Sequence, residues 1–300
     1  IMKLRILLFC FFTYLSLTTS YAQNEFITTW QISNDNVEIQ IPIDDFNYNY
    51  DYTVDFGDGT ILNNQTGSAS HTYATAGTYT IKISGTFPKF NGGGSPDIDK
   101  IMTIEQWGNI QWLNMKSAFE GAVSLTINAT DSPDLSLVSD MSNMFASALL
   151  VNSPTISTWD VSNVTDMNGL FANTQNFNQP LNNWNVSNVN TMKNMFAGSE
   201  SFNQPLNNWN VSNVTDMSSM FNGGFDGTDS VFNQDLNNWD VSNVTEMSFM
   251  FAFSNFNQPL DSWVVSSVFN MAGMFFNSDY DQPLNSWDVS NVQFMGEMFG

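Results

Sequence analysis

The chain has 300 residues, of which 29 are acidic and only seven are lysine or arginine, giving a formal net charge of −22 at pH 7. Because proteins bind nucleic-acid phosphates mainly through lysine and arginine, this balance excludes DNA and RNA as partners. The chain has a single cysteine, Cys10, so a disulfide framework is excluded as well.

Residues 1–22 have the features of a signal peptide. Lys3 and Arg5 form a positive start, residues 6–17 are mainly apolar, and residues 20–22 bring small side chains to the expected cleavage point. The apolar run is too short to span a membrane, and no later stretch qualifies, so we predict no transmembrane span in the mature chain. An exported chain without disulfides is stabilised by its core, its repeats or bound ions.

Residues 23–107 show the period of two that is typical of strands. Apolar and polar residues alternate over residues 37–41, 52–56 and 79–83, and glycine-containing turns lie between them. We predict a small antiparallel β-sandwich whose last strand begins at Ile101. The glycine-rich stretch at residues 90–96 is interpreted as a flexible excursion or a hinge.

Three short motifs in this unit resemble the polycystic-kidney-disease (PKD) domain family. They are DFGDGT at residues 55–60, HTY at 71–73 and GTY at 77–79. The resemblance implies an immunoglobulin-like sandwich that serves as an extracellular spacer or protein-contact module and has no catalytic role.

The rest of the chain is built from one recurring pattern. Its clearest copy, FNQPLNNWNVSNVTDMSSMF, runs from Phe202 to Phe221, and less regular copies end at Phe119 and Phe145. The regular copies are marked by Trp159, Trp184, Trp209, Trp239, Trp263 and Trp287. A fixed period of this length is typical of solenoids, so residues 108–300 are predicted to form about eight stacked coils of 24–30 residues.

Two spacings within a copy predict the shape of one coil. The stretch from Leu206 to Val211 has the spacing of a leucine-rich-repeat strand, and the apolar residues after it recur at helical intervals. We therefore predict a β-rich, two-domain fold, in which the sandwich precedes a leucine-rich-repeat solenoid of short parallel strands and helical or 3-10 turns. The predicted core of one coil comprises Leu206, Trp209, Val211, Val214, Met217, Met220 and Phe221. The tryptophan and methionine rows are therefore interpreted as core and not as a binding platform.

The repeats resemble the bacterial BspA-like leucine-rich-repeat surface proteins, whose units read W-D-V-S-x-V-x-x-M-x-x-M-F. The match is strongest at residues 159–167, 209–221, 239–251 and 287–299. The resemblance implies a secreted protein displayed at the bacterial cell surface, outside the outer membrane, with an adhesion role. Its partner would be an extracellular protein or glycan on another cell or matrix. A glycan-binding accessory module of a polysaccharide-utilisation system is the alternative.

A polar row flanks the repeated tryptophans. It includes Asn183, Asn185, Asn208, Asn210, Asn238 and Asp240. Stacked coils would align these side chains at roughly 4.8 Å. The aligned amides would either bond to one another as a ladder or form a ligand face for glycan hydroxyls or a polar protein surface.

Two pairs of carboxylates are candidates for a calcium site. Asp226 and Asp229 lie in a five-residue expansion of one repeat, where Phe225 is expected to be exposed and to belong to the predicted ligand face. Asp55 and Asp58 lie in the predicted hairpin, where turn formation also explains them. The sequence predicts no cofactor, with calcium at one of these pairs as the open alternative.

We predict that the protein is not an enzyme. His71 is the only histidine and belongs to a PKD-like motif, and no nucleophile and base can be paired from the usual residue types. Since Gly300 directly follows a full repeat, we also expect further coils and an anchoring domain beyond it.

Overall fold

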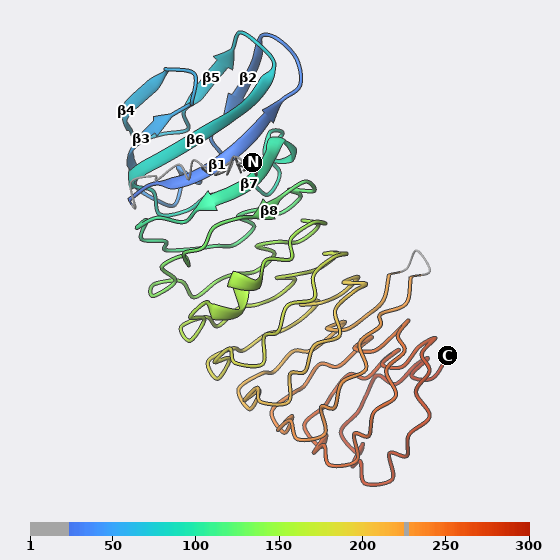
Figure 1. Ribbon diagram of the computed structural model, residues 1–300. Coiled ribbons are helices and arrows are strands. Elements are labelled where there is room, and N and C mark those ends of the chain that lie inside the picture. Colours follow the sequence, from blue (N-terminus) through green and yellow to red (C-terminus); the bar gives the residue numbers. More distant parts are fainter. Residues whose placement is uncertain (1–23, 225–227) are drawn as a thin grey trace, which may run out of the picture.

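The computed structural model describes residues 24–224 and 228–300 (Figure 1). The predicted signal peptide, residues 1–22, lies outside them. The strands are β1 (Phe26–Ile32), β2 (Val37–Gln40), β3 (Asp51–Asp55), β4 (Ile61–Gln65), β5 (Ser70–Tyr73), β6 (Gly77–Thr86), β7 (Ile101–Gln106) and β8 (Thr126–Ile127). The 3-10 helices are η1 (Ile98–Lys100) and η2 (Pro154–Thr158).

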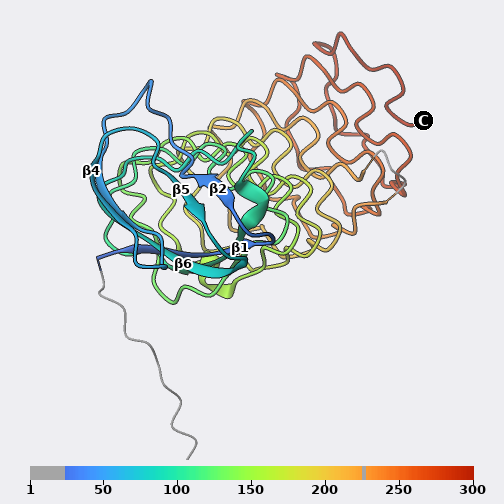
Figure 2. The ribbon, with the colours of Figure 1, turned by 90° about the horizontal axis from the view of Figure 1, so that it is seen from above.

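The N-terminal part consists of two sheets, in agreement with the predicted β-rich start. The larger sheet has the order β4-β3-β6-β1-β7-β8, and the smaller one pairs β2 with β5. Tyr73 of β5 stacks on Tyr79 of β6 with ring centroids 4.0 Å apart, so the small sheet packs on the large one (Figure 2). The strands form because alternate side chains, such as Ile81 and Ile83 of β6, are buried.

The large sheet continues into the first repeat. β7 pairs antiparallel with β1 and parallel with β8, which belongs to the repeat region. The glycine-rich segment at residues 90–96 is not a hinge: Phe90 is buried and stacks on Phe119 at 5.2 Å, and the backbone N–H of Gly93 donates to Ser117. The sheets and the repeats therefore share one hydrophobic core.

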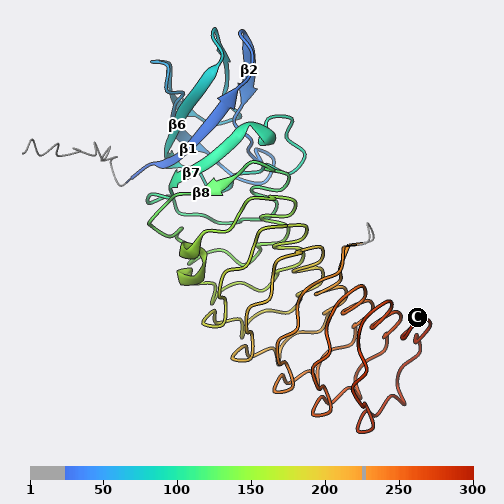
Figure 3. The same cartoon turned by 45° about the vertical axis from the view of Figure 1, so that its right-hand side comes forward.

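The predicted leucine-rich-repeat solenoid with short parallel strands and helical turns is wrong. The last strand, β8, ends at Ile127, and the described part of residues 128–300 contains no strand and, apart from η2, no helix. Successive repeats are joined by single-residue parallel bridges, such as Asp166 to Thr191 and Thr191 to Asp216. We call the coils over residues 128–300 the repeat stack (Figure 3).

The predicted strand segment turns because its backbone bonds locally. The N–H of Trp209 donates to the carbonyl of Leu206, and that of Val214 donates to Val211. Each bond spans three residues and closes a turn, so the segment does not extend into a strand. We call this side of the stack the tryptophan wall, residues 181–186, 206–211, 236–241, 260–265 and 284–289.

The predicted helical segment is interrupted by left-handed residues. Gly169 and Asn173 have φ values of 62° and 56°, and Asn194 and Gly198 repeat the pattern one coil later. A left-handed residue every fourth position prevents an α-helix, because an α-helix needs right-handed φ and ψ throughout. We call this side the ladder wall, residues 167–173, 192–198, 217–223, 247–253 and 271–277.

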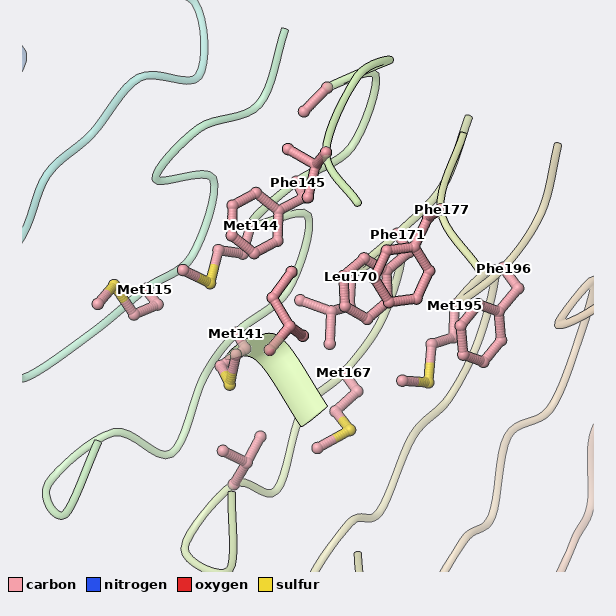
Figure 4. Close-up of a cluster of buried hydrophobic side chains, with 14 of the residues drawn as sticks. Met115, Met141, Met144, Phe145, Met167, Leu170, Phe171, Phe177, Met195 and Phe196 are labelled. Carbon is pink, nitrogen blue, oxygen red and sulfur yellow. The ribbon is translucent and has the colours of Figure 1, made fainter. Parts of the chain in front are cut away.

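The ladder wall joins coils through alternate backbone N–H groups. Met167, Gly169, Phe171 and Asn173 donate to carbonyls of the next coil at 2.7–3.1 Å. The predicted core is confirmed, since all seven side chains are at most 4% exposed. Figure 4 shows equivalent methionines and phenylalanines of successive coils packed in rows. Phe202, which lies outside the predicted core set, is buried as well.

The coils lie closer together at the ladder wall than at the tryptophan wall. Phe196 and Phe221, whose planes are nearly parallel, are 5.7 Å apart, whereas Trp209 and Trp239 are 6.3 Å apart. Backbone hydrogen bonds hold the ladder wall, while the tryptophan wall is joined by side chains. The stack therefore bends towards the ladder wall.

Candidate functional site

The tryptophan wall turns its indoles inward. Each indole Nε1 from Trp184 onward donates to a carbonyl of the preceding coil at 2.8–3.0 Å. The carbonyls belong to Ile156, Leu181, Leu206, Leu236 and Leu260. These indoles tie one coil to the next, and the interpretation of the tryptophan row as core is confirmed for the buried Trp159, Trp184, Trp209, Trp239 and Trp263.

The polar residues directly after the tryptophans cap their own turns. Oδ1 of Asn185, Asn210 and Asp240 accepts the backbone N–H two residues further on, at 3.1–3.2 Å. This geometry is an Asx turn. Hydrogen bonds from the hydroxyl of Ser242 and, to a smaller extent, from its backbone N–H stabilise the carboxylate of Asp240 and lower its pKa. Three residues of the predicted ligand face therefore have a structural role in their own coils.

The residues directly before the tryptophans are different. Asn183, Asn208 and Asn238 are exposed at one position of three successive coils, and their side chains form no hydrogen bond with any described residue. The neighbouring Asn182 and Asn207 bond to each other across coils, Nδ2 to Oδ1, at 3.2 Å. We call Asn183, Asn208 and Asn238 the amide row. It is the part of the predicted ligand face whose polar groups are available to a ligand.

A second polar row, which the sequence analysis did not identify, joins the coils internally. Oδ1 of Asn203 accepts the backbone N–H of Asn233 at 3.0 Å and Nε2 of Gln234 at 2.9 Å. The same pair of bonds recurs along the stack with Asn152, Asn178, Asn233 and Asn257 as acceptors. The recurring Asn-Gln pair was visible in the sequence, but its partners lie one coil away.

The inserted loop begins at the ladder wall. Phe225 and Asp226 lie outside the described residues, and Asp229 is exposed. The calcium pair proposed for this loop therefore stays a prediction. Beside the loop lies a shallow groove of about 180 Å³, lined by Asn173, Asn194, Ala197, Gly198, Ser219, Asn222, Gly223 and Gly224.

The second calcium candidate is a hydrogen-bonded hairpin. Oδ1 of Asp55 accepts the N–H of Gly57 at 2.9 Å, and Oδ1 of Asp58 accepts that of Thr60 at 3.0 Å. Oδ2 of Asp58 is 2.8 Å from Nε2 of His71. Burial raises the pKa of Asp58, but the bonds from Thr60 and His71 outweigh burial and hold the pKa below its usual value.

His71 connects this hairpin to the core of the sheets. Its ring lies 4.8 Å from that of Phe56 and 4.6 Å from that of Tyr73. This packing and the bond to Asp58 are those of a structural residue.

Within residues 24–224 and 228–300, no three histidine, cysteine, aspartate or glutamate side chains gather as ligands for a metal ion. No helix in the same residues has the length and apolar character to cross a membrane.

Two protein-family models match this chain. The PKD domain matches residues 27–88, so the predicted resemblance to that family is confirmed. The family described as "Mycoplasma protein of unknown function, DUF285" matches residues 113–227 and 223–300. No curated protein and no solved structure gave a match. Because the second family model covers more than half of the sequence, the chain belongs to the DUF285 family and carries a PKD domain before its repeats.

Proposed function

We propose that this chain is an exported protein of the bacterial cell surface that attaches to an extracellular protein or glycan through its repeat stack. A PKD domain and DUF285 repeats are consistent with a surface or adhesion-type protein. The resemblance of the repeats to BspA-like surface proteins supports attachment, and the pattern of residues 1–22 supports export from the cytoplasm.

The amide row is the observation that carries this proposal. Each asparagine amide offers two donors and a carbonyl acceptor. In Asn183, Asn208 and Asn238 these groups are exposed and unused, although almost identical neighbours bond within the protein. The adjacent indoles are buried and bonded, so the row stands on a rigid wall and binding requires little ordering.

We also propose that the protein is not an enzyme and needs no cofactor. Its only histidine is packed between two rings and bonded to Asp58. A carboxylate whose replacement abolishes a hydrolytic activity of the purified chain would contradict this proposal.

The test of the attachment function is a triple variant, Asn183→Ala, Asn208→Ala and Asn238→Ala. Binding of the purified chain to a panel of immobilised extracellular-matrix proteins and glycans is measured by biolayer interferometry. We expect at least about tenfold weaker binding, since several hydrogen bonds are lost together. Unchanged binding to every ligand that the unmodified chain binds would contradict a role for the amide row.

The control is a second triple variant, Asn176→Ala, Ser201→Ala and Asn255→Ala. These residues are exposed, share one position of the repeat and have no side-chain hydrogen bond with a described residue. We expect the control to bind like the unmodified chain.

The second candidate function is a glycan-binding accessory module of an extracellular polysaccharide-utilisation system. The amide row favours it, because free amides bond well to sugar hydroxyls. Glycan binding that depends on Asn208 or Asn238 would support this candidate. Binding to a protein partner that both substitutions leave unchanged would support the adhesin.

A further inference from the structure

The ladder wall and the position two residues before it change from small or polar to aromatic along the stack. Phe249, Phe253, Phe269 and Phe276 occupy positions that have other residues one coil earlier. Those earlier residues are, in the same order, Ser219, Gly223, Thr245 and Ala252. We call the four phenylalanines the aromatic patch; they lie in the orange coils of Figure 1.

The rings of the aromatic patch are held in place and partly exposed; Phe249, Phe253 and Phe276 are half-buried. The ring of Phe249 lies over Gly273, where an added Cβ would come within 2.3 Å of a ring carbon. The rings of Phe253 and Phe276 meet edge to face at 5.4 Å, and the side chain of Phe269 is 38% exposed. None of the four belongs to the buried core row of its coil.

The backbone shows that stability alone does not favour these phenylalanines. Phe249 and Phe253 have φ values of 55° and 50°, a region that is unfavourable for bulky residues and is better suited to glycine or asparagine. Other coils place Asn194 and Gly198 at the same two positions. Half-buried aromatic rings kept in a strained backbone indicate a functional role.

The shallow groove adjoins the aromatic patch. The N–H of Gly223, on the groove wall, donates to the carbonyl of Ala252, which directly precedes Phe253. On the other side of the groove, the side-chain amides of Asn173 and Asn194 have no hydrogen-bond partner among the described residues. Along the stack, the unpaired side-chain amides of Asn173 and Asn194 are therefore followed by the rings of the aromatic patch.

The charge of this region limits what can occupy it. Residues 173–300, which include the groove and the aromatic patch, contain twelve acidic residues and one basic residue, Lys193. Like charges repel, so a polyanion or the same region of a second copy is disfavoured. Aromatic rings pack against the C–H face of a pyranose, and amides bond to its hydroxyls. Together these features fit an uncharged carbohydrate.

We propose that the aromatic patch and the adjoining groove bind a neutral polysaccharide that lies along the stack. Hydrogen-bonded backbone segments of neighbouring coils are about 4.8 Å apart. This spacing is close to the length that one sugar adds to a β-linked pyranose chain, so successive sugars can contact successive coils. The site is separate from the amide row. Phe196 of the ladder wall and Trp209 of the tryptophan wall face each other across the core at 6.5 Å, so the two walls have opposite outer surfaces.

The test is affinity electrophoresis of the full chain in gels that contain hydroxyethylcellulose, xyloglucan, mannan or laminarin, with alginate as the anionic comparison. We expect retardation by at least one neutral polymer and none by alginate. The binding should persist at 0.5 M NaCl, because salt screens charge interactions and leaves stacking intact.

The variants copy the preceding coil, so each replacement is already accommodated at an equivalent position. Phe249→Ser, Phe253→Gly and Phe276→Ala together should weaken binding of an oligosaccharide of the retarding polymer at least about tenfold in calorimetry. Phe269→Thr should have a smaller effect. Phe249→Ser and Phe253→Gly relieve left-handed backbone at a bulky residue, so their Tm should equal or exceed that of the unmodified chain.

The matched control is the triple variant Asn176→Ala, Ser201→Ala and Asn255→Ala, whose replaced side chains are exposed and belong to neither the aromatic patch nor the amide row, and it should keep its polysaccharide binding. Absence of retardation by all four neutral polymers, or equal retardation of the aromatic triple variant, overturns the proposal. Binding only to basic proteins that disappears at 0.5 M NaCl also overturns it. Since the aromatic patch and the amide row lie on different walls and are tested with different variants, the two proposals can fail independently.

Discussion

The two sheets and the repeat stack join neighbouring segments in different ways. β1 and β6 are paired through seven consecutive residues, from Phe26 with Ile83 to Ile32 with Gly77. Neighbouring coils share a single-residue bridge, a ladder of alternate N–H groups and rows of side-chain bonds. In the stack, a repeated side chain lies next to the equivalent side chain of the neighbouring coil, as Trp209 lies next to Trp239. Repeated asparagine and tryptophan contacts therefore take the place of continuous strand pairing.

This difference determines where each region is vulnerable. Each residue of the sheets contacts a different set of partners. Equivalent residues of different coils, in contrast, make the same bond to the neighbouring coil, as Trp209 and Trp239 do, so replacing either one removes the same kind of bond. Five changes, from the largest expected effect to the smallest, test this comparison.

The largest effect is expected where the two regions meet. Trp107 is fully buried and packs on Phe26 of β1 at 5.8 Å and on Trp159 of the stack at 5.4 Å. Trp107→Ala should lower the free energy of unfolding by about 3–5 kcal/mol, because it opens a cavity shared by both regions. Calorimetry should show one transition before and after the substitution. Val123→Ala, at a side chain that is 41% exposed, is the control. Two transitions, with only the first shifted, would contradict a common core.

The second effect isolates one bond between coils. Trp209→Phe removes the Nε1–H that donates to the carbonyl of Leu181 at 2.8 Å. Trp159→Phe removes a similar volume, but the buried Nε1 of Trp159 has no hydrogen-bond partner. Chemical denaturation should show Trp209→Phe to be less stable than Trp159→Phe by about 1–3 kcal/mol, the cost of a buried carbonyl left unpaired. Equal losses would show that the indole contributes through packing alone.

The third effect concerns the Asn-Gln row. Asn203→Ala removes an acceptor for both Asn233 and Gln234, so we expect a loss of about 1–3 kcal/mol in urea unfolding. Asn208→Ala, at an exposed residue of the amide row, should stay within about 0.5 kcal/mol. If the two variants were equally stable, the row would not hold the coils together.

The fourth effect concerns pH in the sheet region. The pKa of Asp58 is depressed in the folded state, so its contribution to stability is present above the unfolded pKa of about 3.9 and is lost as the pH falls through the folded pKa. The Tm of the unmodified chain should therefore fall more steeply below about pH 4 than that of Asp58→Asn. Asp45→Asn, at an exposed carboxylate, should keep the steep fall. Parallel curves for all three proteins would rule out Asp58 as the source.

The smallest effect is expected from calcium. The carboxylates of Asp55 and Asp58 already accept hydrogen bonds within the hairpin, so we expect the same Tm in calcium and in EDTA. A higher Tm in calcium that disappears in Asp226→Asn and Asp229→Asn would place an ion in the inserted loop. That result would revise the expectation of a protein without bound metal.

The fold was predictable where burial follows a simple local period. The strand at residues 79–83 lies within β6, and that at residues 37–41 matches β2, because alternate residues face the core. The coil conformation was not predictable in the same way. Met217 and Met220 recur at helical spacing, yet the backbone between them turns left-handed at Ser219, and only the bonds to the next coil favour this geometry.

The candidate sites show the same limit. The sequence indicated a polar row beside the tryptophans, but it gave no means to separate Asn208, which is free, from Asn210, which caps a turn. The Asn-Gln row and the aromatic patch depend on which residues of neighbouring coils lie together. Sequence periodicity identifies equivalent positions but does not show which of them point outwards.

The sequence by itself determined the repeat period, the buried side chains of each coil, the PKD unit and the acidic charge. These follow from composition and from apolar spacing within about 25 residues, which any stacked arrangement must satisfy. Only the tertiary structure decided the left-handed ladder wall, the sheet that runs from β1 through β7 into β8, and the opposite positions of Asn208 and Phe249. These features depend on hydrogen bonds and contacts between segments that are at least one repeat apart.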